Sequence, residues 1–190
     1  MKIITKMALV ACVALLSQGA FAQSKMESKE KTVMVGGAAM YPSKNIVENA
    51  VNSKDHTTLV AAVKAAGLVE TLQSAGPFTV FAPVNAAFDK LPKGTVETLL
   101  KEENKGMLTG ILTYHVVSGK WSAADIAALI KKGNGKAELK TVAGGVLVAT
   151  MKGNSLILTD EKGGTAMVTI KDVNQSNGVI HVIDTVLMPK

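Results

Sequence analysis

The segment TVFAPVNAAF, from Thr79 to Phe88, contains a strand, a stop signal and a helix start. Thr79 to Ala82 is a short apolar run typical of a buried strand. Pro83 ends that strand because proline has no N–H to donate to a ladder. Asn85 stands where a helix N-cap belongs, since its side-chain oxygen can accept from an unpaired backbone N–H. The segment therefore predicts a strand that leads directly into a helix.

A second segment, NGVIHVIDTVLMP from Asn177 to Pro189, predicts a turn followed by a buried strand. Asn177 and Gly178 form the turn because both residues tolerate a positive φ. The run from Val179 to Leu187 is apolar and largely β-branched, as expected of a strand that is covered on both faces. Pro189 prevents further pairing.

Together these segments resemble the two signature boxes of the fasciclin (FAS1) domain family. Tyr114-His115-Val116-Val117, predicted to lie in an apolar strand, resembles the Tyr-His segment between the boxes. The resemblance extends from about Asn45 to the C-terminus. It implies an α+β fold: a β-sandwich or wedge of mostly antiparallel strands, with several helices packed at one side and drawn mainly from the N-terminal half. The residues that carry it are given structural roles: Thr79, Phe81, Pro83, Asn85, Phe88, Gly178, His181 and Pro189.

The hydrophobic periodicity places helices first and strands later, which favours an α+β arrangement. In the helix predicted to follow an Asp55 cap, the buried stripe is Leu59, Ala62, Val63 and Ala66, and Gly67 stops the helix. The other predicted helices cover 46–51, 68–73, a segment from Asn85, one capped by Thr95, 105–112 with Met107 buried, and 123–132 capped by Ser122. The predicted strands cover 138–141, 146–152, 155–159, 166–173 and 178–187.

The N-terminus has the pattern of a secretory signal peptide. Lys2 and Lys6 precede an apolar run from Met7 to Leu16, and Ala20-Phe21-Ala22 has the form of a cleavage site. We therefore expect residues 1–22 to be removed and the protein to be periplasmic or extracellular, with no transmembrane segment after cleavage. A lipid anchor at Cys12 is the alternative. Residues 23–43 are expected to be a flexible tail or spacer, in which 33–35 could add a strand, and 44–190 a single domain.

Composition excludes several classes of function. Cys12 is the only cysteine, so the cleaved chain has no disulfide, thiol nucleophile or thiolate metal site. Without Lys2 and Lys6 the chain has 19 lysines against 15 acidic residues, a charge of +4. All its basic residues are lysine, whereas bidentate recognition of phosphates and bases favours arginine. Nucleic-acid binding is therefore not expected.

The histidines are the candidates for chemistry. His115 is interpreted as a buried residue that hydrogen-bonds to Asn85 or to nearby backbone, the alternative being a general base or metal ligand. His181 could join a metal site only with a third ligand such as Asp172 or Asp184, and no known metal-binding spacing is present. His56 is expected to be exposed and inert. We predict no catalytic residues, no metal and no cofactor.

The resemblance implies a secreted, non-enzymatic adhesion or interaction module. The interaction residues that we expect are Tyr114, His115, Asp172, Val173 and Asn177. Of these, Asp172-Val173 lies where animal members carry an Asp-Ile pair that belongs to an integrin-binding motif. The expected partner is a protein or polysaccharide at a cell surface or in a matrix, or weakly another copy of the chain. The alternatives are a small-ligand or ester-directed protein with a pocket near His115, and a purely structural envelope protein.

One departure from the family pattern concerns the first box. Members commonly carry a hydroxyl or acidic residue where Val84 stands. The replacement removes a side chain that could cap the following helix and leaves Asn85 as the expected cap.

Overall fold

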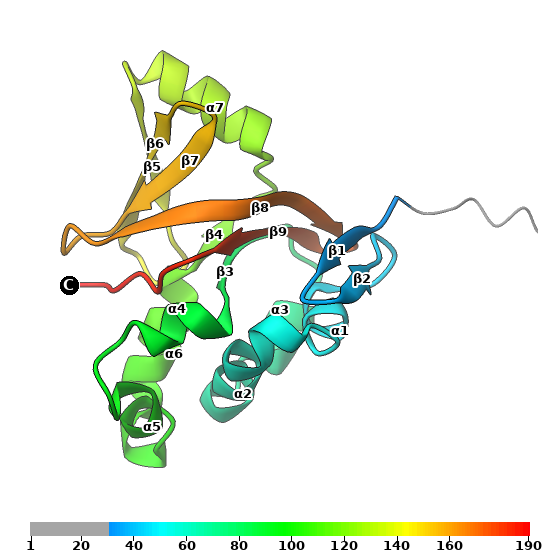
Figure 1. Ribbon diagram of the computed structural model, residues 1–190, viewed down its shortest axis with the longest axis vertical. Coiled ribbons are helices and arrows are strands. Elements are labelled where there is room, and N and C mark those ends of the chain that lie inside the picture. The colour runs from blue at the N-terminus through cyan, green and yellow to red at the C-terminus, as the bar shows by residue number, and fades with distance from the viewer. Residues whose placement is uncertain (1–30) are drawn as a thin grey trace, which may run out of the picture.

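The computed structural model describes residues 31–190, so the signal peptide and the Cys12 alternative lie outside the described residues. The fold is α+β, with a curved sheet between a cluster of helices and one further helix (Figure 1). The strands are β1 Val33–Val35, β2 Ala38–Met40, β3 Phe78–Pro83, β4 Val116–Ser118, β5 Lys136–Lys140, β6 Val146–Lys152, β7 Ser155–Thr159, β8 Thr165–Gln175 and β9 Gly178–Ile183.

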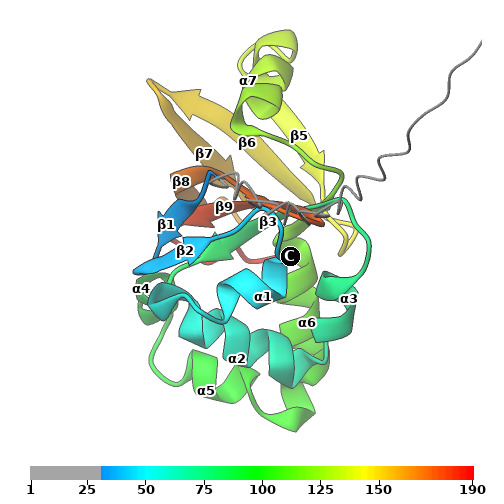
Figure 2. The ribbon, with the colours of Figure 1, turned by 90° about the vertical axis from the view of Figure 1, so that its right-hand side faces the viewer.

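The helices precede most of the strands along the chain. They are α1 Ile46–Ala50, α2 Thr57–Ala66, α3 Val69–Gln73, α4 Asn85–Asp89, α5 Thr95–Leu99, α6 Lys105–Tyr114 and α7 Ala123–Lys132, with 3₁₀ turns at Lys54–His56 and Glu102–Asn104. Figure 2 shows α1 to α6 gathered on one side of the sheet and α7 beside β5 and β6 on the other. The expected concentration of helices in the N-terminal half is confirmed.

The main sheet has seven strands in the order β4-β3-β9-β8-β7-β6-β5. All neighbours are antiparallel except β3 and β9, which are parallel. A bridge between Val117 and Thr141 brings the β4 end of the sheet to the β5 end. The sheet therefore curves round and buries side chains on both of its faces, which produces the expected wedge.

The two signature segments form the centre of this sheet. Because side chains alternate along a strand, Val80 and Ala82 face the helices α1 to α6, while Phe81 faces α7 and strands β5 to β8. On β9, Ile180 and Val182 join the first of these cores. The parallel pairing of β3 and β9 thus joins two hydrophobic cores across one sheet.

The segment expected to be a spacer is ordered from Val33 onward, which corrects that prediction. β1 and β2 form a hairpin in register through Val33 and Met40. Val35 and Met40 are each only 3% exposed and pack in the same core as α1 and α2. Burying two large aliphatic side chains stabilises this hairpin by roughly 1.5–3 kcal/mol for each, so the domain begins before residue 44.

Local signals predict several elements closely. Leu59, Ala62, Val63 and Ala66 are the buried residues of α2, and Gly67 ends that helix at φ 72°. α7 begins with a capping box in which Ser122 accepts from the Asp125 N–H and the Asp125 carboxylate accepts from the Ser122 N–H. Strands β6 and β7 have the predicted bounds.

Other predictions about the elements are wrong. Tyr114 ends α6 and His115 caps it, so the strand begins only at Val116. Met107 is 61% exposed instead of buried. β9 ends at Ile183, because the chain bends at Asp184, although Val186 and Leu187 beyond it remain buried.

The turn between β8 and β9 lies one residue earlier than predicted, and it does not depend on a positive φ at Asn177 or Gly178. Gln175 pairs with Gly178, so the two loop residues are Ser176 and Asn177. Neither Asn177 nor Gly178 has a positive φ, whereas Asp172 in the bulged part of β8 has φ 59°. Glycine is needed at 178 because a Cβ there would lie 2.1 Å from the Phe78 carbonyl oxygen.

The observed N-caps of α4 and α5 differ from the predicted ones. The N-cap of α4 is Val84, with φ −73° and ψ 163°, and no side chain caps this helix. Asn85 is its first helical residue instead. The N-cap of α5 is Gly94, not Thr95.

Val84→Thr is expected to stabilise the protein by about 1 kcal/mol. A threonine hydroxyl at this extended N-cap can accept a hydrogen bond from an unpaired backbone N–H in the first turn of α4. Threonine has the same shape as valine, so the partial packing of Val84 on the core is largely kept. The measurement is urea unfolding of the two proteins. Val84→Ala is the control and should destabilise, since it removes the packing without adding a cap. Equal stability of Val84→Thr and Val84→Ala would contradict the prediction.

Candidate functional site

Tyr114, expected at an interaction surface, is completely buried. Its hydroxyl donates to the Val146 carbonyl at 2.9 Å and accepts from the Glu161 N–H at 3.2 Å. The Glu161 carboxylate accepts in turn from the Val146 N–H at 3.0 Å. Burial raises the pKa of Tyr114. The side chain therefore joins α6 to β6 and to the turn after β7, and it is not available to a partner.

Tyr114→Phe is expected to cost about 1–2 kcal/mol of unfolding free energy, because the Val146 carbonyl and the Glu161 N–H both lose their tyrosine partner. The phenylalanine ring keeps the packing. Urea unfolding measures the change. Tyr41→Phe is the matched control, since Tyr41 is 40% exposed and its loss should be close to neutral. A similar loss for both variants would contradict the role assigned to Tyr114.

His115 is buried and both of its ring nitrogens are occupied by backbone. Nδ1–H donates to the Ile111 carbonyl at 2.8 Å, and Nε2 accepts from the Leu187 N–H at 3.0 Å. Burial lowers the pKa of His115 to about 4. The predicted bond to backbone is confirmed, but no bond to Asn85 is formed. His115 is neutral and holds the end of α6 to the C-terminal segment, so it has no free nitrogen for proton transfer.

His181 has a comparable role on the second signature strand. Its Nε2–H donates to the Trp121 carbonyl at 2.9 Å, and Nδ1 accepts from the Asp172 N–H at 3.3 Å. The ring stacks on Phe81 with centroids 5.6 Å apart. Burial lowers the pKa of His181. Among the described residues 31–190, no three His, Cys, Asp or Glu side chains are grouped so that they could hold a metal ion.

Asp172 and Val173 do not form an exposed pair. Val173 is 1% exposed and belongs to the core beneath the helices. Asp172 is half-buried, and its Oδ1 accepts from the N–H of Ala123 at 2.7 Å. This bond anchors the first residue of α7 to the bulge of β8. Asp172 also lines an open groove between α7 and strands β7 and β8.

Asn177 binds the ends of two helices. Its Oδ1 accepts from the Ile46 N–H at 3.0 Å, where α1 begins. Its Nδ2 donates to the Leu72 and Ser74 carbonyls, at 2.8 and 3.0 Å, where α3 ends. Asn177 is therefore a connector between the β8–β9 turn and the helices. The expectation that it shares an exposed patch with Tyr114 and Val173 is wrong, since those two are buried.

The Asn85 side chain bonds to the first turn of α2 and not to α4, the helix that Asn85 itself begins. Its Oδ1 accepts from the Thr58 N–H at 3.0 Å, in the first turn of α2, and its Nδ2 donates to the Lys54 carbonyl at 2.8 Å. Thr79, also in the first box, is fully buried, and its hydroxyl donates to the Gly119 carbonyl and accepts from the Trp121 N–H. Thr79, Asn85, Asn177 and His181, the polar signature residues described so far, thus bond mainly to backbone groups of the fold.

The residues that sequence reasoning missed are His56 and Asp160. His56 is 3% exposed instead of solvent-exposed, and it lines a cavity beneath the β1–β2 hairpin. Asp160 is 7% exposed and accepts from the backbone N–H groups of Lys162, Gly164 and Met188. The partners of Asp160 at Lys162 and Gly164 belong to its own turn, whereas Met188 and the hairpin beside His56 are distant in sequence.

The comparisons with known proteins agree with this architecture. A family model described as Fasciclin domain matches residues 54–189. Protein sll1483 of Synechocystis sp. (strain ATCC 27184 / PCC 6803 / Kazusa) is 48% identical over 168 residues, which cover 88% of this chain and 86% of that protein. Immunogenic protein MPB70 of Mycobacterium bovis is 41% identical over 145 residues, which cover 74% of this chain and 66% of that one.

A solved structure has the same fold. A FAS1 domain pair from the insect cell adhesion molecule Fasciclin I superposes with a TM-score of 0.69 at 17% identity, over 78% of this chain and 52% of that one. In the part of the chain that the structure describes, no helix is long and apolar enough to cross a membrane.

Proposed function

The chain belongs to the fasciclin domain family, and we propose that it is a secreted, non-enzymatic module that binds a protein or polysaccharide at a cell surface or in a matrix. The observation that carries this proposal is the internal use of the signature residues. The polar atoms of Tyr114, His115 and His181 form hydrogen bonds to backbone groups of the fold. Such a scaffold leaves its exterior for recognition, and a domain pair with the same fold belongs to an insect cell adhesion molecule.

The surface that we assign to binding is the groove between α7 and strands β7 and β8. It presents small side chains of α7, and the polar residues Asn154, Lys171 and Asp172 lie along it. Apolar and polar groups together suit a protein segment or a sugar chain, which both need hydrogen bonds and some apolar contact. Asp172 is the one predicted interaction residue that lines this groove.

The sharpest test is Asp172→Asn. Asparagine tolerates the positive φ of this position and keeps an oxygen that can accept from the Ala123 N–H, so only the charge is removed. We expect binding to cell envelopes, to purified polysaccharides or to immobilised copies of the chain to weaken by roughly 10-fold or more, as for a polar contact at the centre of an interface.

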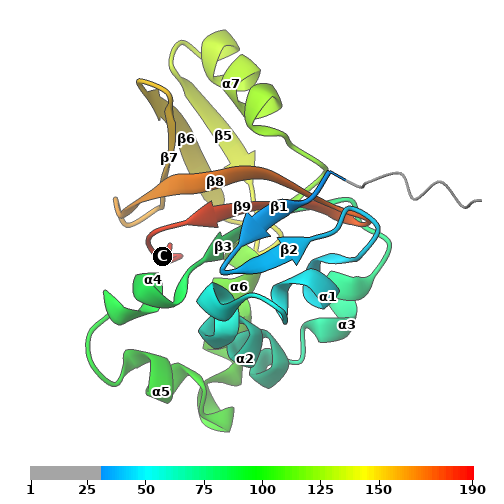
Figure 3. The same cartoon turned by 45° about the vertical axis from the view of Figure 1, so that its right-hand side comes forward.

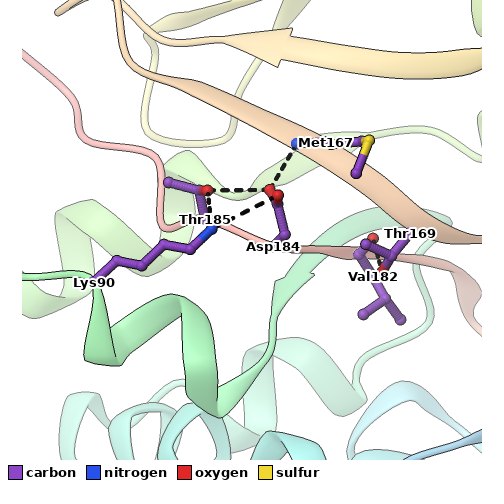
Figure 4. A network of polar contacts seen from close by, with 6 residues as sticks. All are labelled: Lys90, Met167, Thr169, Val182, Asp184 and Thr185. Atoms are coloured by element: carbon purple, nitrogen blue, oxygen red, sulfur yellow. Dashed lines mark hydrogen bonds and ion pairs between the residues drawn. The ribbon is translucent and has the colours of Figure 1, made fainter.

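Asp184→Asn is the matched control. Asp184 is also half-buried, and its Oδ1 accepts from the Met167 N–H at 2.8 Å, but it lies at the end of β9 beside Lys90 and Thr185 (Figure 4). Its exposed ion pair with Lys90, at 3.7 Å, contributes little stability. Unchanged binding for both variants would place the binding surface elsewhere. The absence of any saturable partner would count against the interaction function itself.

The alternative function, a protein with a pocket near His115, has no support as an enzyme that uses this histidine. Both nitrogens of His115 are bonded to backbone, so a hydrolase that uses His115 as its base is not supported. A small-ligand role is a separate question, because a cavity does lie beside His115.

A further inference from the structure

Two open hollows adjoin one another between helix α7 and β5, the last strand in the order of the sheet. Their volumes are about 660 and 450 Å³. Leu129 of α7 and Glu138 of β5 line both hollows, so together they form one trough, which we call the β5 trough. Figure 3 shows α7 next to β5, away from helices α1 to α6. The groove lined by Asp172 lies on the other flank of α7, where it is bounded by β7 and β8.

The larger hollow contains the only tryptophan of the chain, Trp121. This residue is half-buried, so part of it packs on the core beneath α7 and part lines the trough. Three hydrogen bonds fix its position. Its N–H donates to the Thr79 hydroxyl at 2.9 Å, its carbonyl accepts from His181 Nε2–H at 2.9 Å, and its Nε1–H donates to the Ser118 carbonyl at 3.0 Å. A ring held in this way loses little conformational freedom when a ligand covers it.

Exposed lysines border the trough at both ends. They are Lys120, Lys131, Lys132, Lys136 and Lys140. Lys136 and Lys140 line the hollows themselves, Lys120 directly precedes Trp121, and the pair at 131–132 directly precedes Gly133 in the smaller hollow. Within residues 31–190, none of the five forms an ion pair with an acidic side chain. Glu138 is the only acidic residue in the lining, so the trough carries an excess of positive charge that suits an anionic partner.

The spread of these charges favours a polymer over a small anion. Lys136 and Lys140 lie four residues apart on the same face of β5, which separates their backbones by about 13 Å. A single small anion can bond to only part of the array, whereas a chain with repeated negative groups can bond along its length. Nucleic acid fits poorly, because the protein has no arginine and the lining offers one aromatic ring, whereas successive bases need several.

A sugar chain fits the trough better than an acidic peptide does. A pyranose presents a C–H face that packs on the flat indole of Trp121, while its hydroxyls point to the side. Glu138 lies between Lys136 and Lys140 on the exposed face of β5, where its carboxylate accepts hydrogen bonds and repels other carboxylates. A polymer with hydroxyls as well as charges satisfies Glu138, whereas a chain of acidic side chains does not.

We propose that the β5 trough binds an acidic polysaccharide whose sugar units carry carboxylates. One sugar stacks on Trp121, hydroxyls donate to Glu138, and carboxylates pair with Lys136 and Lys140. This second site goes beyond the function proposed above, because it uses the other flank of α7. Asp172→Asn should therefore leave binding to the trough unchanged, and either proposal can fail without the other.

Tryptophan fluorescence of the full chain reports on this site alone, since Trp121 is the only tryptophan. The probes are polygalacturonate and alginate, two polyuronates of different linkage. At least one of them should shift the emission to shorter wavelength in a saturable way, because the sugar displaces water from the indole. The methyl ester of that polymer keeps the sugar without the charge, and polyglutamate keeps the charge without the sugar. Each of these controls should bind roughly 10-fold more weakly or worse.

Three results of this titration would overturn the proposal. No saturable shift with either polyuronate would mean that the trough is not a binding site for this class of polymer. Equal affinity for the methyl ester would remove the role of the lysines. Equal affinity for polyglutamate would remove the role of the sugar and leave only an attraction between opposite charges.

Two pairs of substitutions separate the lysines of the trough from the charge of the whole protein. Lys136→Gln combined with Lys140→Gln should weaken polyuronate binding by roughly 10-fold or more. Lys64→Gln combined with Lys93→Gln removes the same charge from exposed positions outside the lining and should have little effect. Equal losses from the two pairs would overturn the proposal.

Trp121→Leu removes the ring and leaves the lysines in place. Titration calorimetry, which needs no tryptophan, should show that this variant binds the polyuronate no more tightly than it binds polyglutamate. A preference for the polyuronate that survives in Trp121→Leu would overturn the stacking role of the ring. The comparison of the polymers on the parent protein holds even if a variant fails to fold.

Discussion

Lowering the pH from 7 to 5 is expected to reduce the free energy of unfolding by about 2 kcal/mol through His115 alone. The pKa of His115 is about 4 in the folded protein, because burial disfavours the charged ring, against an ordinary value of 6.5 in the unfolded chain. The unfolded chain therefore binds a proton first as the pH falls. This contribution to stability is complete above pH 6.5, decreases below it, and levels off below pH 4, where the total loss is about 3 kcal/mol.

His56 and His181 act in the same direction, since burial lowers the pKa of each. Protonation of His115 would also place a charge at Nε2, which now accepts from the Leu187 N–H. Two N–H groups cannot share that bond. The C-terminal segment should consequently detach from α6 as the protein unfolds in acid.

His115→Gln tests this account. Glutamine does not titrate, and its side-chain oxygen can still accept from the Leu187 N–H. The measurement is urea unfolding at pH 7, 6 and 5 for both proteins. The variant starts less stable, and the stability gap between the two proteins should narrow toward pH 5 by about 2 kcal/mol. A gap that is constant with pH would show that His115 does not control the acid sensitivity.

Local sequence signals are sufficient for much of this fold. Strands β6 and β7 are predictable with their observed bounds because alternation and the Gly153-Asn154 turn lie within a few residues of one another. The same holds for α7, whose cap at Ser122 and partner at Asp125 are three residues apart. Each of these features is decided by neighbours in the chain, so the pattern alone indicates it.

The candidate site cannot be predicted in the same way. Asn177 stands out in the sequence, but its bond to Ile46 joins residues that are 131 positions apart. Asn85 is expected to cap its own helix, and it instead serves α2, 27 residues earlier. His56 shares a cavity wall with Val35 and Met40 of a hairpin that lies in the segment predicted to be a spacer. The residue types are those of capping and connecting groups, whereas their partners are set by tertiary packing that no local pattern contains.

Gly178→Ala is expected to have the largest effect of any single methyl addition at the β3–β9 junction, a loss of ~4 kcal/mol or more. A Cβ at this position would lie 2.1 Å from the Phe78 carbonyl oxygen and 2.9 Å from its carbon. Both are backbone atoms, so no side-chain rotation can relieve the overlap. Phe78 pairs with Gly178 at the start of the parallel ladder, and the strands must separate there to admit the methyl group.

Separation at this point would also move Asn177, whose backbone carbonyl accepts from the Phe78 N–H at 3.1 Å and whose side chain holds α1 and α3. The damage therefore extends from the sheet to the helices, which makes partial unfolding of the N-terminal half the expected result. Hydrogen exchange of the α1 and α3 amides would detect it even where the variant retains a folded sheet.

Gly110→Ala is the matched control for this prediction. Gly110 lies inside α6, and a Cβ added there would have nothing within 4 Å, so alanine should stabilise by about 0.5–1 kcal/mol through its higher helix propensity. The same change from glycine to alanine is thus predicted to lower the free energy of unfolding at position 178 and to raise it at position 110. Urea unfolding of both variants measures these changes. A Gly178→Ala protein whose free energy of unfolding lies within about 1 kcal/mol of the parent value would mean that the β3–β9 junction is looser than the structure shows. The role of the second signature segment as a rigid connector would then have to be abandoned.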